Sequence, residues 1–341
     1  MLKNVKLCIL LQLKQQIAEQ AEALNNDQIG FASLAATFAK LLPLARITKQ
    51  AEFVEILQKH KDLHNQLVDL LGAVQSIEAH NAILEVFPLN EADYNADWLE
   101  KYLQSLAVGT HPDRAIIEDL LKILKTNDET ALNDEKLKDT VLQTLASLTH
   151  QMGFEPQESL LQQIRSYILD QLVKKCPEDD ASCETRYIRA LQNLQDVNTI
   201  PVLLETALKA SSKASVAAMQ ALRSFPVERF SERDRALFAQ IFFQHQRKYD
   251  TSARTVAFDI LLALKPTKEQ LGQFLEYLGS NDRHYEIKTY VIQKLKMLSE
   301  KCPRFNALLR DCLHERPKIN NYHVIGQKGL FHLFNAHNYF H

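Results

Sequence analysis

Histidine pairs are the first candidates for chemistry in this chain. His60 and His64 lie four residues apart with Asp62 between them, a spacing that puts two imidazoles on one face of a helix, as in helical metal sites. The glutamate of the metalloprotease motif is missing, and so are a third and a fourth ligand. We therefore expect a solvated helix face here, with no metal site and no cofactor.

Other chemistry-bearing residues are equally unspecific. The chain has no Gly-x-Gly-x-x-Gly, no P-loop and no Gly-x-Ser-x-Gly sequence, so nucleotide binding and a nucleophile elbow are not indicated. Trp98 and Tyr102 are spaced as neighbours on a helix, where core packing is the expected role and ligand stacking the alternative. We expect no catalytic activity. Metal binding at the C-terminal histidines would be unspecific; they are His323, His332, His337 and His341.

The cysteines offer one candidate cross-link. Cys176 and Cys183 flank a short polar loop where two helical patterns meet, so a local disulfide is geometrically reasonable and would imply an oxidising compartment. Two free thiols in a cytosolic protein fit the same spacing equally well. A zinc site is not expected, because no histidine or second cysteine pair lies nearby at ligand spacing.

Arg254 is the most informative charge. Arg254, Ala257 and Leu261 are spaced by three and then four residues, so the guanidinium begins on the buried stripe of an apolar helix. A buried charge must be paired, and the equivalent position 32 residues further on holds Glu286. We predict a buried Arg254–Glu286 ion pair; the alternative is an arginine whose charged end reaches water.

The elements that position these residues must be helices. Only 8 glycines and 10 prolines occur in 341 residues, and 46% of the residues are hydrophobic, which argues against a β-sandwich, a barrel or a disordered chain. Lys and Arg (40) nearly balance Asp and Glu (42). Since phosphate contacts dominate affinity for nucleic acid, this balance argues against a nucleic-acid partner.

The helices are expected in pairs. Amphipathic segments follow one another from about residue 5 to 313, about 17 in number, and three successive pairs begin near Ile200, Glu232 and Lys268, at steps of 32 and 36 residues. These steps are close to the periods of helical repeats. The second helices, 213–224 and 253–264, are apolar nearly all round and should be covered on both sides. We predict an all-α, two-layer α-solenoid; an irregular bundle is the alternative.

The two ends of the chain differ from its middle. The apolar run 7–13 is too short for a signal peptide and lacks a cleavage site, and no stretch reaches the roughly 18 apolar residues needed to span a bilayer. From about residue 316 the helical pattern stops. We therefore expect an α-helical solenoid domain over 1–315 and an irregular tail over 316–341, which would be the start of a missing β domain.

Several short segments resemble one family. Thr185-Arg186-Tyr187, then Ile200-Pro201-x-Leu203-Leu204, and later Arg254-Thr255 with the apolar helix that follows, are similar to the helical domain of the large lipid transfer proteins. This superfamily includes vitellogenin, apolipoprotein B and the microsomal triglyceride transfer proteins, and the likeness is greatest to the large subunits of the last group. It is good over 135–315, weaker over 30–135 and absent over 331–341.

The resemblance implies a horseshoe of helices that wraps around lipid-binding β-sheets. It implies a disulfide between Cys176 and Cys183 and a paired Arg254 and Glu286. It further implies a scaffold role in moving neutral lipids and phospholipids for lipoprotein assembly in the endoplasmic reticulum lumen, with protein disulfide isomerase and an apolipoprotein B-like lipoprotein as partners. The family's β domains are missing here, so we expect the helical portion of such a protein. A generic HEAT-like scaffold and a vitellogenin-like yolk domain are the alternatives.

Overall fold

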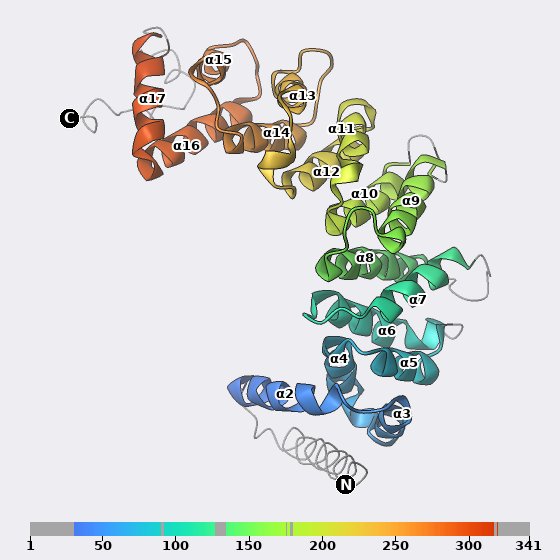
Figure 1. Ribbon diagram of the computed structural model, residues 1–341. Helices are drawn as coiled ribbons and strands as arrows, with labels where there is room; N and C mark the ends of the chain where they lie inside the picture. Colours follow the sequence, from blue (N-terminus) through green and yellow to red (C-terminus); the bar gives the residue numbers. More distant parts are fainter. Residues whose placement is uncertain are drawn as a thin grey trace. The chain divides into compact units, whose positions relative to one another are not determined.

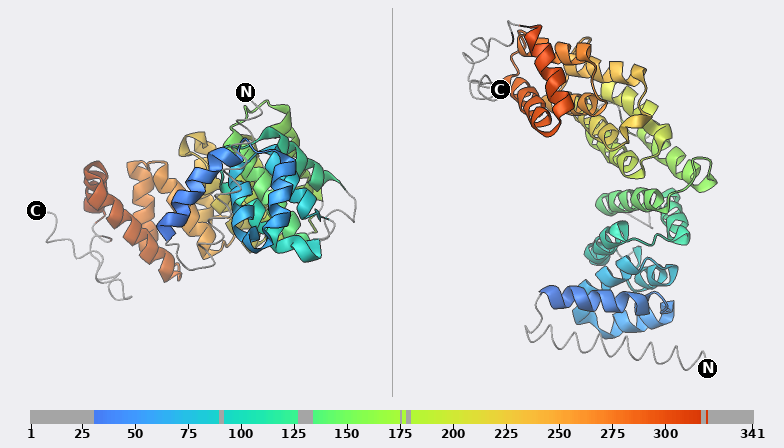
Figure 2. Two further views of the ribbon diagram at one scale, coloured as in Figure 1. Left: turned by 90° about the horizontal axis from the view of Figure 1, so that it is seen from below. Right: turned by 60° about the vertical axis from the view of Figure 1, so that its left-hand side comes forward.

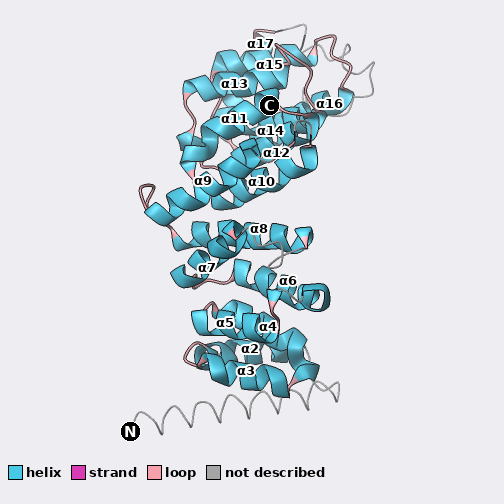
Figure 3. Cartoon of the chain, turned by 90° about the vertical axis from the view of Figure 1, so that its right-hand side faces the viewer, coloured by secondary structure: helices cyan, strands magenta, loops and turns pink. Residues whose placement is uncertain are grey.

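The computed structural model describes residues 31–89, 92–126, 134–174, 176–177, 180–316 and 319. This part of the chain forms 16 α-helices and contains no strand (Figure 3). The all-α prediction is therefore confirmed. None of these helices is long and apolar enough to cross a membrane. The first of the expected amphipathic segments, which begins at about residue 5, and nearly all of the tail after residue 316 lie outside the described residues.

The described residues fall into two compact units, whose helices are labelled in Figure 1. The first unit runs to residue 176 and includes 189–196, and the second comprises 177–188 and everything from 197 onward. The first unit contains α2 (Phe31–Ala45), α3 (Gln50–Lys59), α4 (His64–Val74), α5 (Ile77–Val86), α6 (Ala92–Val108), α7 (Arg114–Lys125), α8 (Glu135–Met152) and α9 (Ser159–Lys174). Helix α10 (Ala181–Leu194) contributes residues to both units. The second unit contains α11 (Ile200–Lys209), α12 (Ser212–Arg223), α13 (Glu232–Phe243), α14 (Thr251–Ala263), α15 (Lys268–Leu278), α16 (Tyr285–Lys301) and α17 (Pro303–His314).

The first unit is built in two layers. Helices α4, α6 and α8 pack side by side, α3 and α5 pack beside one another, and α5 contacts α7. The apolar face of α4 explains its central place, because Leu67, Val68, Leu71 and Val74 are all buried. Gly72 allows the closest approach: a Cβ there would lie 2.9 Å from the backbone oxygen of Tyr102 in α6. The close packing of α4 against α6 therefore depends on the absence of a side chain at Gly72.

The second unit repeats this plan, and the views of Figure 2 show it from two other sides. Helix α12 packs between α11 and α14, and α14 contacts both α13 and α16. The helices expected to be covered on both sides, α12 and α14, bury nearly every apolar side chain, Ala214, Met219, Phe258 and Leu261 among them. Their partners α11, α13 and α15 begin at Ile200, Glu232 and Lys268. The predicted helix pairing is confirmed here.

Helix starts follow their capping signals closely. Ser231 and Thr267 each form a capping box with the residue three positions later, and Pro201 lies in the first turn of α11, as expected. Thr48 is an exception. Lys49 is the N-cap of α3, and the Thr48 hydroxyl instead donates to the carbonyl of Leu44, 2.9 Å away.

Helix ends seldom use the glycine that commonly follows a helix in left-handed backbone. Among the described glycines only Gly153 is left-handed (φ 66°), whereas Gly279, which follows α15, is right-handed. Left-handed backbone is found instead at Gln75, Gln195, Gln244 and Lys265. At Gln75 the side chain offsets the strain. Its amide donates to the carbonyl of Leu106 at 2.8 Å, and its Oε1 accepts from the backbone N–H of His111.

Candidate functional site

The charged site of the second unit surrounds Arg254, in the first turn of α14. The side chain is completely buried. Its Nε donates to the carbonyl of Phe242, 2.9 Å away, and its Nη2 donates to the hydroxyl of Tyr277 (3.0 Å) and to Oδ2 of Asp282 (2.7 Å). The guanidinium thus connects the end of α13, α15 and the loop that precedes α16.

The carboxylate that pairs with Arg254 is Asp282, and the predicted Arg254–Glu286 pair is wrong in its partner. Glu286 lies exposed in the first turn of α16, where a carboxylate is favoured by the helix dipole without a buried partner. Asp282 precedes the helix, and its loop turns the carboxylate back towards α14. The burial of Arg254 and its pairing with an acid agree with the prediction.

Hydrogen bonds hold Asp282 in its ionised form. Burial acts to raise the pKa of this carboxyl, but bonds from the backbone and ring of His284, from Arg254 and from Tyr277 outweigh it, so the pKa lies well below its usual range. The His284 Nδ1 is 2.6 Å from Oδ1 of Asp282, and the Tyr277 hydroxyl donates to Oδ2 at 2.9 Å. Burial raises the pKa of Tyr277, so this hydroxyl keeps its proton.

These contacts form a structural junction. The guanidinium has four partners, because its Nη1 also lies 3.4 Å from Nδ1 of His284, and the acid has four donors around it. Stacked aromatic rings of Phe242 and Phe258 pack beside it, with centroids 5.1 Å apart. A buried, fully paired charge offers no unpaired group to a substrate. It is costly to break, because removing one partner leaves the other charged in a dry environment.

The first unit contains a buried polar chain that sequence reasoning missed. His80 in α5 is completely buried. Its Nδ1 is 2.9 Å from the Tyr102 hydroxyl of α6, and its Nε2 is 3.1 Å from Oδ2 of Asp119 in α7. Burial, with Asp119 nearby, raises the pKa of Tyr102, and the His80 hydrogen bond lowers the pKa of Asp119. One feature of the sequence could have predicted the burial of His80: it lies with Ala79, Ala82 and Ile83 on the apolar face of a helix.

The two histidines do not share a helix face, because His60 lies at the end of α3 and His64 begins α4, and His64 is packed against other residues. His64 Nε2 lies 2.8 Å from the carbonyl of Leu57, and its ring meets those of Phe87 and Trp98 edge-on, with centroids 5.1 and 5.5 Å away. Trp98 therefore belongs to a packed aromatic cluster, and Tyr102 is buried, as the packing prediction requires. Within the described residues no group of three or more His, Cys, Asp or Glu could hold a metal ion. His323, His332, His337 and His341 lie outside them.

The cysteines divide into two classes. Cys176 and Cys183 are both disulfide-bonded, so the alternative of two free thiols is wrong. Cys302 is free and exposed, and Cys312 is free and buried. Cys8 lies outside the described residues. Disulfides are typical of proteins from oxidising compartments.

Comparison with known proteins agrees with this architecture. The model of the vitellogenin TPR domain matches residues 12–304. The chain is 50% identical to the microsomal triacylglycerol transfer protein of Drosophila melanogaster over 322 residues, which cover 93% of the chain and 35% of that protein. It is 23% identical to the Homo sapiens microsomal triglyceride transfer protein large subunit over 75% of the chain and 28% of the relative.

A solved structure of lipovitellin, described by its lipid–protein interactions, has the same fold. The TM-score is 0.65 at 17% identity, over 88% of this chain and 32% of that one. The chain thus spans about a third of the length of these relatives. The resemblance to the large lipid transfer proteins is confirmed, and with a match over residues 12–304 the chain belongs to the vitellogenin TPR domain family.

Proposed function

We propose that this chain is the helical scaffold of a lipid transfer protein, one that moves neutral lipids and phospholipids for lipoprotein assembly. The observation that carries the proposal is the 50% identity to the Drosophila microsomal triacylglycerol transfer protein across 93% of the chain. The buried Arg254–Asp282 junction and the helix pairs support a mechanical role, because they hold neighbouring helices of the second unit together. In this proposal the chain performs no bond-making step.

The proposed setting is the lumen of the endoplasmic reticulum, with protein disulfide isomerase and an apolipoprotein B-like lipoprotein as partners. Disulfides persist in oxidising compartments, and both Cys176 and Cys183 are bonded. We propose that they are bonded to each other, since Cys302 and Cys312 are free. We also propose that residues 1–315 act as one helical domain, with 316–341 leading towards a β domain.

A chimera tests the scaffold role. This chain would replace the matching third of the Drosophila relative, and transfer of fluorescent triacylglycerol between donor and acceptor vesicles would be measured. We expect the chimera to transfer lipid at a rate close to that of the intact relative, and this chain alone to transfer none. A folded, monodisperse chimera without transfer would contradict the proposal.

Two matched variants make the result specific. Arg254→Met in the chimera removes the buried junction and should lower transfer by destabilising the second unit. Lys59→Glu changes an exposed residue of α3 and should leave transfer unchanged. Co-purification of the chimera with protein disulfide isomerase would test the proposed partner separately.

The fold match to lipovitellin favours a second candidate, a yolk-type storage domain. Such a protein holds its lipid and does not release it. In the same assay a storage chimera would remove labelled lipid from donor vesicles without delivering it to acceptors. That pattern would favour storage over transfer.

A further inference from the structure

A contact between an arginine and a histidine ties the end of α2 to the rest of the first unit. Nη2 of Arg46 lies 2.9 Å from Nδ1 of His111, and Nη1 lies 3.3 Å from Nε2. Arg46 directly follows α2, and His111 belongs to the loop between α6 and α7, 65 residues further on. An arginine only donates hydrogen bonds, so the ring of His111 must accept. An imidazole can accept only while it is not protonated.

No carboxylate compensates this contact. Among the described residues, neither Arg46 nor His111 has an ion-pair partner. Lys49, three residues after Arg46, pairs with Glu78 of α5 at 3.1 Å. When His111 takes up a proton, Arg46 loses its acceptor and two positive charges lie in contact. Protonation of this one ring therefore turns an attraction into a repulsion.

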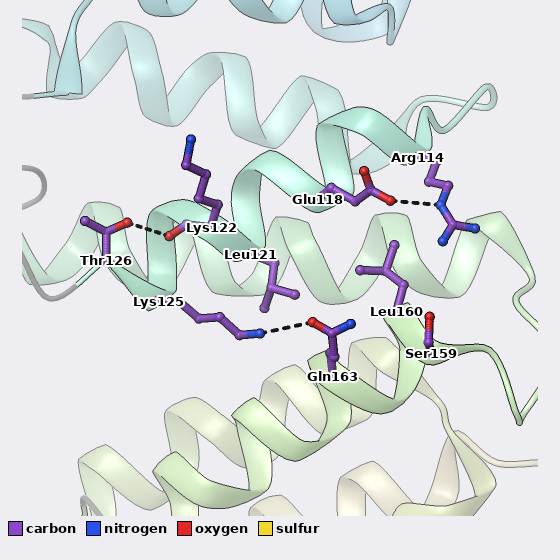
Figure 4. Close-up of a pocket in the computed structure, with 9 residues that line it drawn as sticks. All are labelled: Arg114, Glu118, Leu121, Lys122, Lys125, Thr126, Ser159, Leu160 and Gln163. Carbon is purple, nitrogen blue, oxygen red and sulfur yellow. Dashed lines mark hydrogen bonds and ion pairs between the residues drawn. The ribbon is translucent and has the colours of Figure 1, made fainter.

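The charged groups that follow His111 on its loop and on α7 are engaged elsewhere. The two oxygens of the Asp113 carboxylate accept backbone N–H groups in the first turns of α5 and α7, at 3.2 and 2.9 Å. Arg114 lies against Glu118 (Figure 4) and also pairs with Glu158, each at 2.9 Å. The other polar neighbours of His111, a threonine hydroxyl and a glutamine amide, carry no charge.

Helix α2 has few other attachments to the first unit. Among its described side chains only Leu41 and Ala45 are buried. Pro43 lies inside the helix and has no N–H to donate, so one helical hydrogen bond is missing there. A segment with so few buried contacts opens at a low cost in free energy. Loss of the Arg46 contact should therefore change how often this end of α2 opens.

We propose that the Arg46–His111 contact is a pH-sensitive switch, which holds the C-terminal end of α2 while His111 is neutral and releases it when His111 is protonated. Imidazoles are the side chains that ordinarily change charge between pH 5 and 8. His111 is exposed, so solvent screens part of the repulsion, and the switch acts on local opening of α2 and not on the fold of the unit. The proposal does not rest on lipid transfer, so it stands or falls independently of the scaffold function.

Hydrogen exchange measured by mass spectrometry on the 341-residue chain tests the proposal. Protection of peptides that cover residues 38–49 would be compared at about pH 7.5 and about pH 5.5, on either side of an ordinary imidazole titration, after correction for the chemical exchange rate at each pH. We expect their protection to fall by about two- to fivefold at the lower pH, the size that suits a contact between exposed charges. Peptides of α4 should keep their protection.

Three variants locate the effect. His111→Gln keeps an acceptor for Arg46 but cannot be protonated, so protection of α2 should be the same at both pH values. Arg46→Met should lower protection at the higher pH and remove the acid response. His60→Gln removes an imidazole at the far end of α3 and should respond to acid as wild type does. Circular dichroism and melting curves check that each variant is folded.

Three results would overturn the proposal. One is equal protection of α2 in the wild type at both pH values. Another is an equal acid-induced loss in folded His111→Gln, since a different group would then be responsible. The third is a loss of protection throughout the first unit at the lower pH, which would assign the acid response to unfolding of the unit and not to release of α2.

Discussion

Nη2 of Arg254 lies 2.7 Å from Oδ2 of Asp282, and the guanidinium is wholly shielded from water. This one contact ties α14 to the loop before α16. A buried ion pair of this kind couples the two segments energetically, because removing either partner leaves the other ion unpaired in apolar surroundings, at a large desolvation penalty.

Breaking the junction from one side should be severe. Arg254→Met leaves the Asp282 carboxylate partly buried without its cation, so we expect the free energy of unfolding to fall by about 3 to 5 kcal/mol. Urea denaturation followed by circular dichroism measures this change. The double variant Arg254→Met with Asp282→Leu should lose less than the sum of the two single changes. Strict additivity would show that the two residues are not coupled.

The same pair gives a pH dependence with a defined sign. The pKa of Asp282 is lower in the folded chain than its ordinary value, which is about 3.9 in an unfolded chain. The unfolded state therefore binds the proton first as pH falls, and the stabilisation from Asp282 is complete above about pH 5 and decreases below about pH 4. Urea denaturation at a series of pH values should show a smaller loss in Asp282→Asn than in wild type. Parallel curves for the two proteins would refute this assignment.

Because α4 and α6 approach closely at Gly72, we predict that an alanine at this position lowers the stability of the chain. Alanine normally favours a helix over glycine by about 1 kcal/mol. At Gly72, however, a Cβ would lie 2.6 Å from Cβ of Ser105 and 2.9 Å from the carbonyl oxygen of Tyr102. We expect Gly72→Ala to destabilise the chain by about 1 to 3 kcal/mol, measured by urea unfolding.

Gly272→Ala is the matched control for that change. The three atoms nearest to its Cβ all belong to the guanidinium of Arg316. This is the flexible end of a long side chain, so it can move aside at the cost of its 3.0 Å contact with Glu276. Gly272→Ala should therefore be tolerated. If both alanine variants were equally stable, backbone crowding would not explain Gly72.

The buried polar chain of the first unit should be sensitive to the loss of one hydroxyl. Tyr102→Phe leaves Nδ1 of His80 without its 2.9 Å partner, inside a completely buried site. An unsatisfied buried group costs about 1 to 3 kcal/mol, which thermal or urea unfolding would reveal. Adding His80→Leu should recover part of the loss, because it removes the unpaired nitrogen. A further loss of stability in the double variant would argue against an unpaired Nδ1 of His80 as the cause of the first loss.

Local signals explain how much of the fold is predictable. The capping boxes at Ser231 and Thr267 depend on residues within one turn, and the helix pairs show themselves as a repeat of 32 and 36 residues along the chain, so the sequence is sufficient to find both. Left-handed helix ends at Gln75 and Gln244 are not predictable in the same way, because their strain is relieved by bonds to Leu106, His111 and Tyr249. Neither position holds a glycine, which is the residue that would have indicated left-handed backbone in the sequence.

The site was predictable in kind but not in detail. The spacing of Arg254 on an apolar stripe was enough to expect a buried, paired charge. Its partner could not be identified from the sequence. The repeat period points to Glu286, whereas the conformation of the loop before α16 brings Asp282 into contact with Arg254. His80 and His64 were missed as structural residues because their partners, Asp119 and Trp98, lie on other helices. Contacts between distant segments require the folded chain.

The cysteines should react in a fixed order that tests the proposed pairing of Cys176 with Cys183. Iodoacetamide added to the native chain should label exposed Cys302 and spare buried Cys312, since burial also raises the pKa of the Cys312 thiol and so reduces its thiolate. Cys176 and Cys183 should be labelled only after reduction.

The intact bond between Cys176 and Cys183 should stabilise the chain by about 2 to 3 kcal/mol for so short a loop, so dithiothreitol should lower the urea midpoint of wild type but not of Cys176→Ser with Cys183→Ser. Peptide mapping of the unreduced protein should recover the two cysteines in one cross-linked fragment, and a native Cys183→Ser variant should gain a reactive thiol at Cys176. Labelling of Cys176 in the unreduced wild type would contradict the pairing and, with it, the argument for an oxidising compartment.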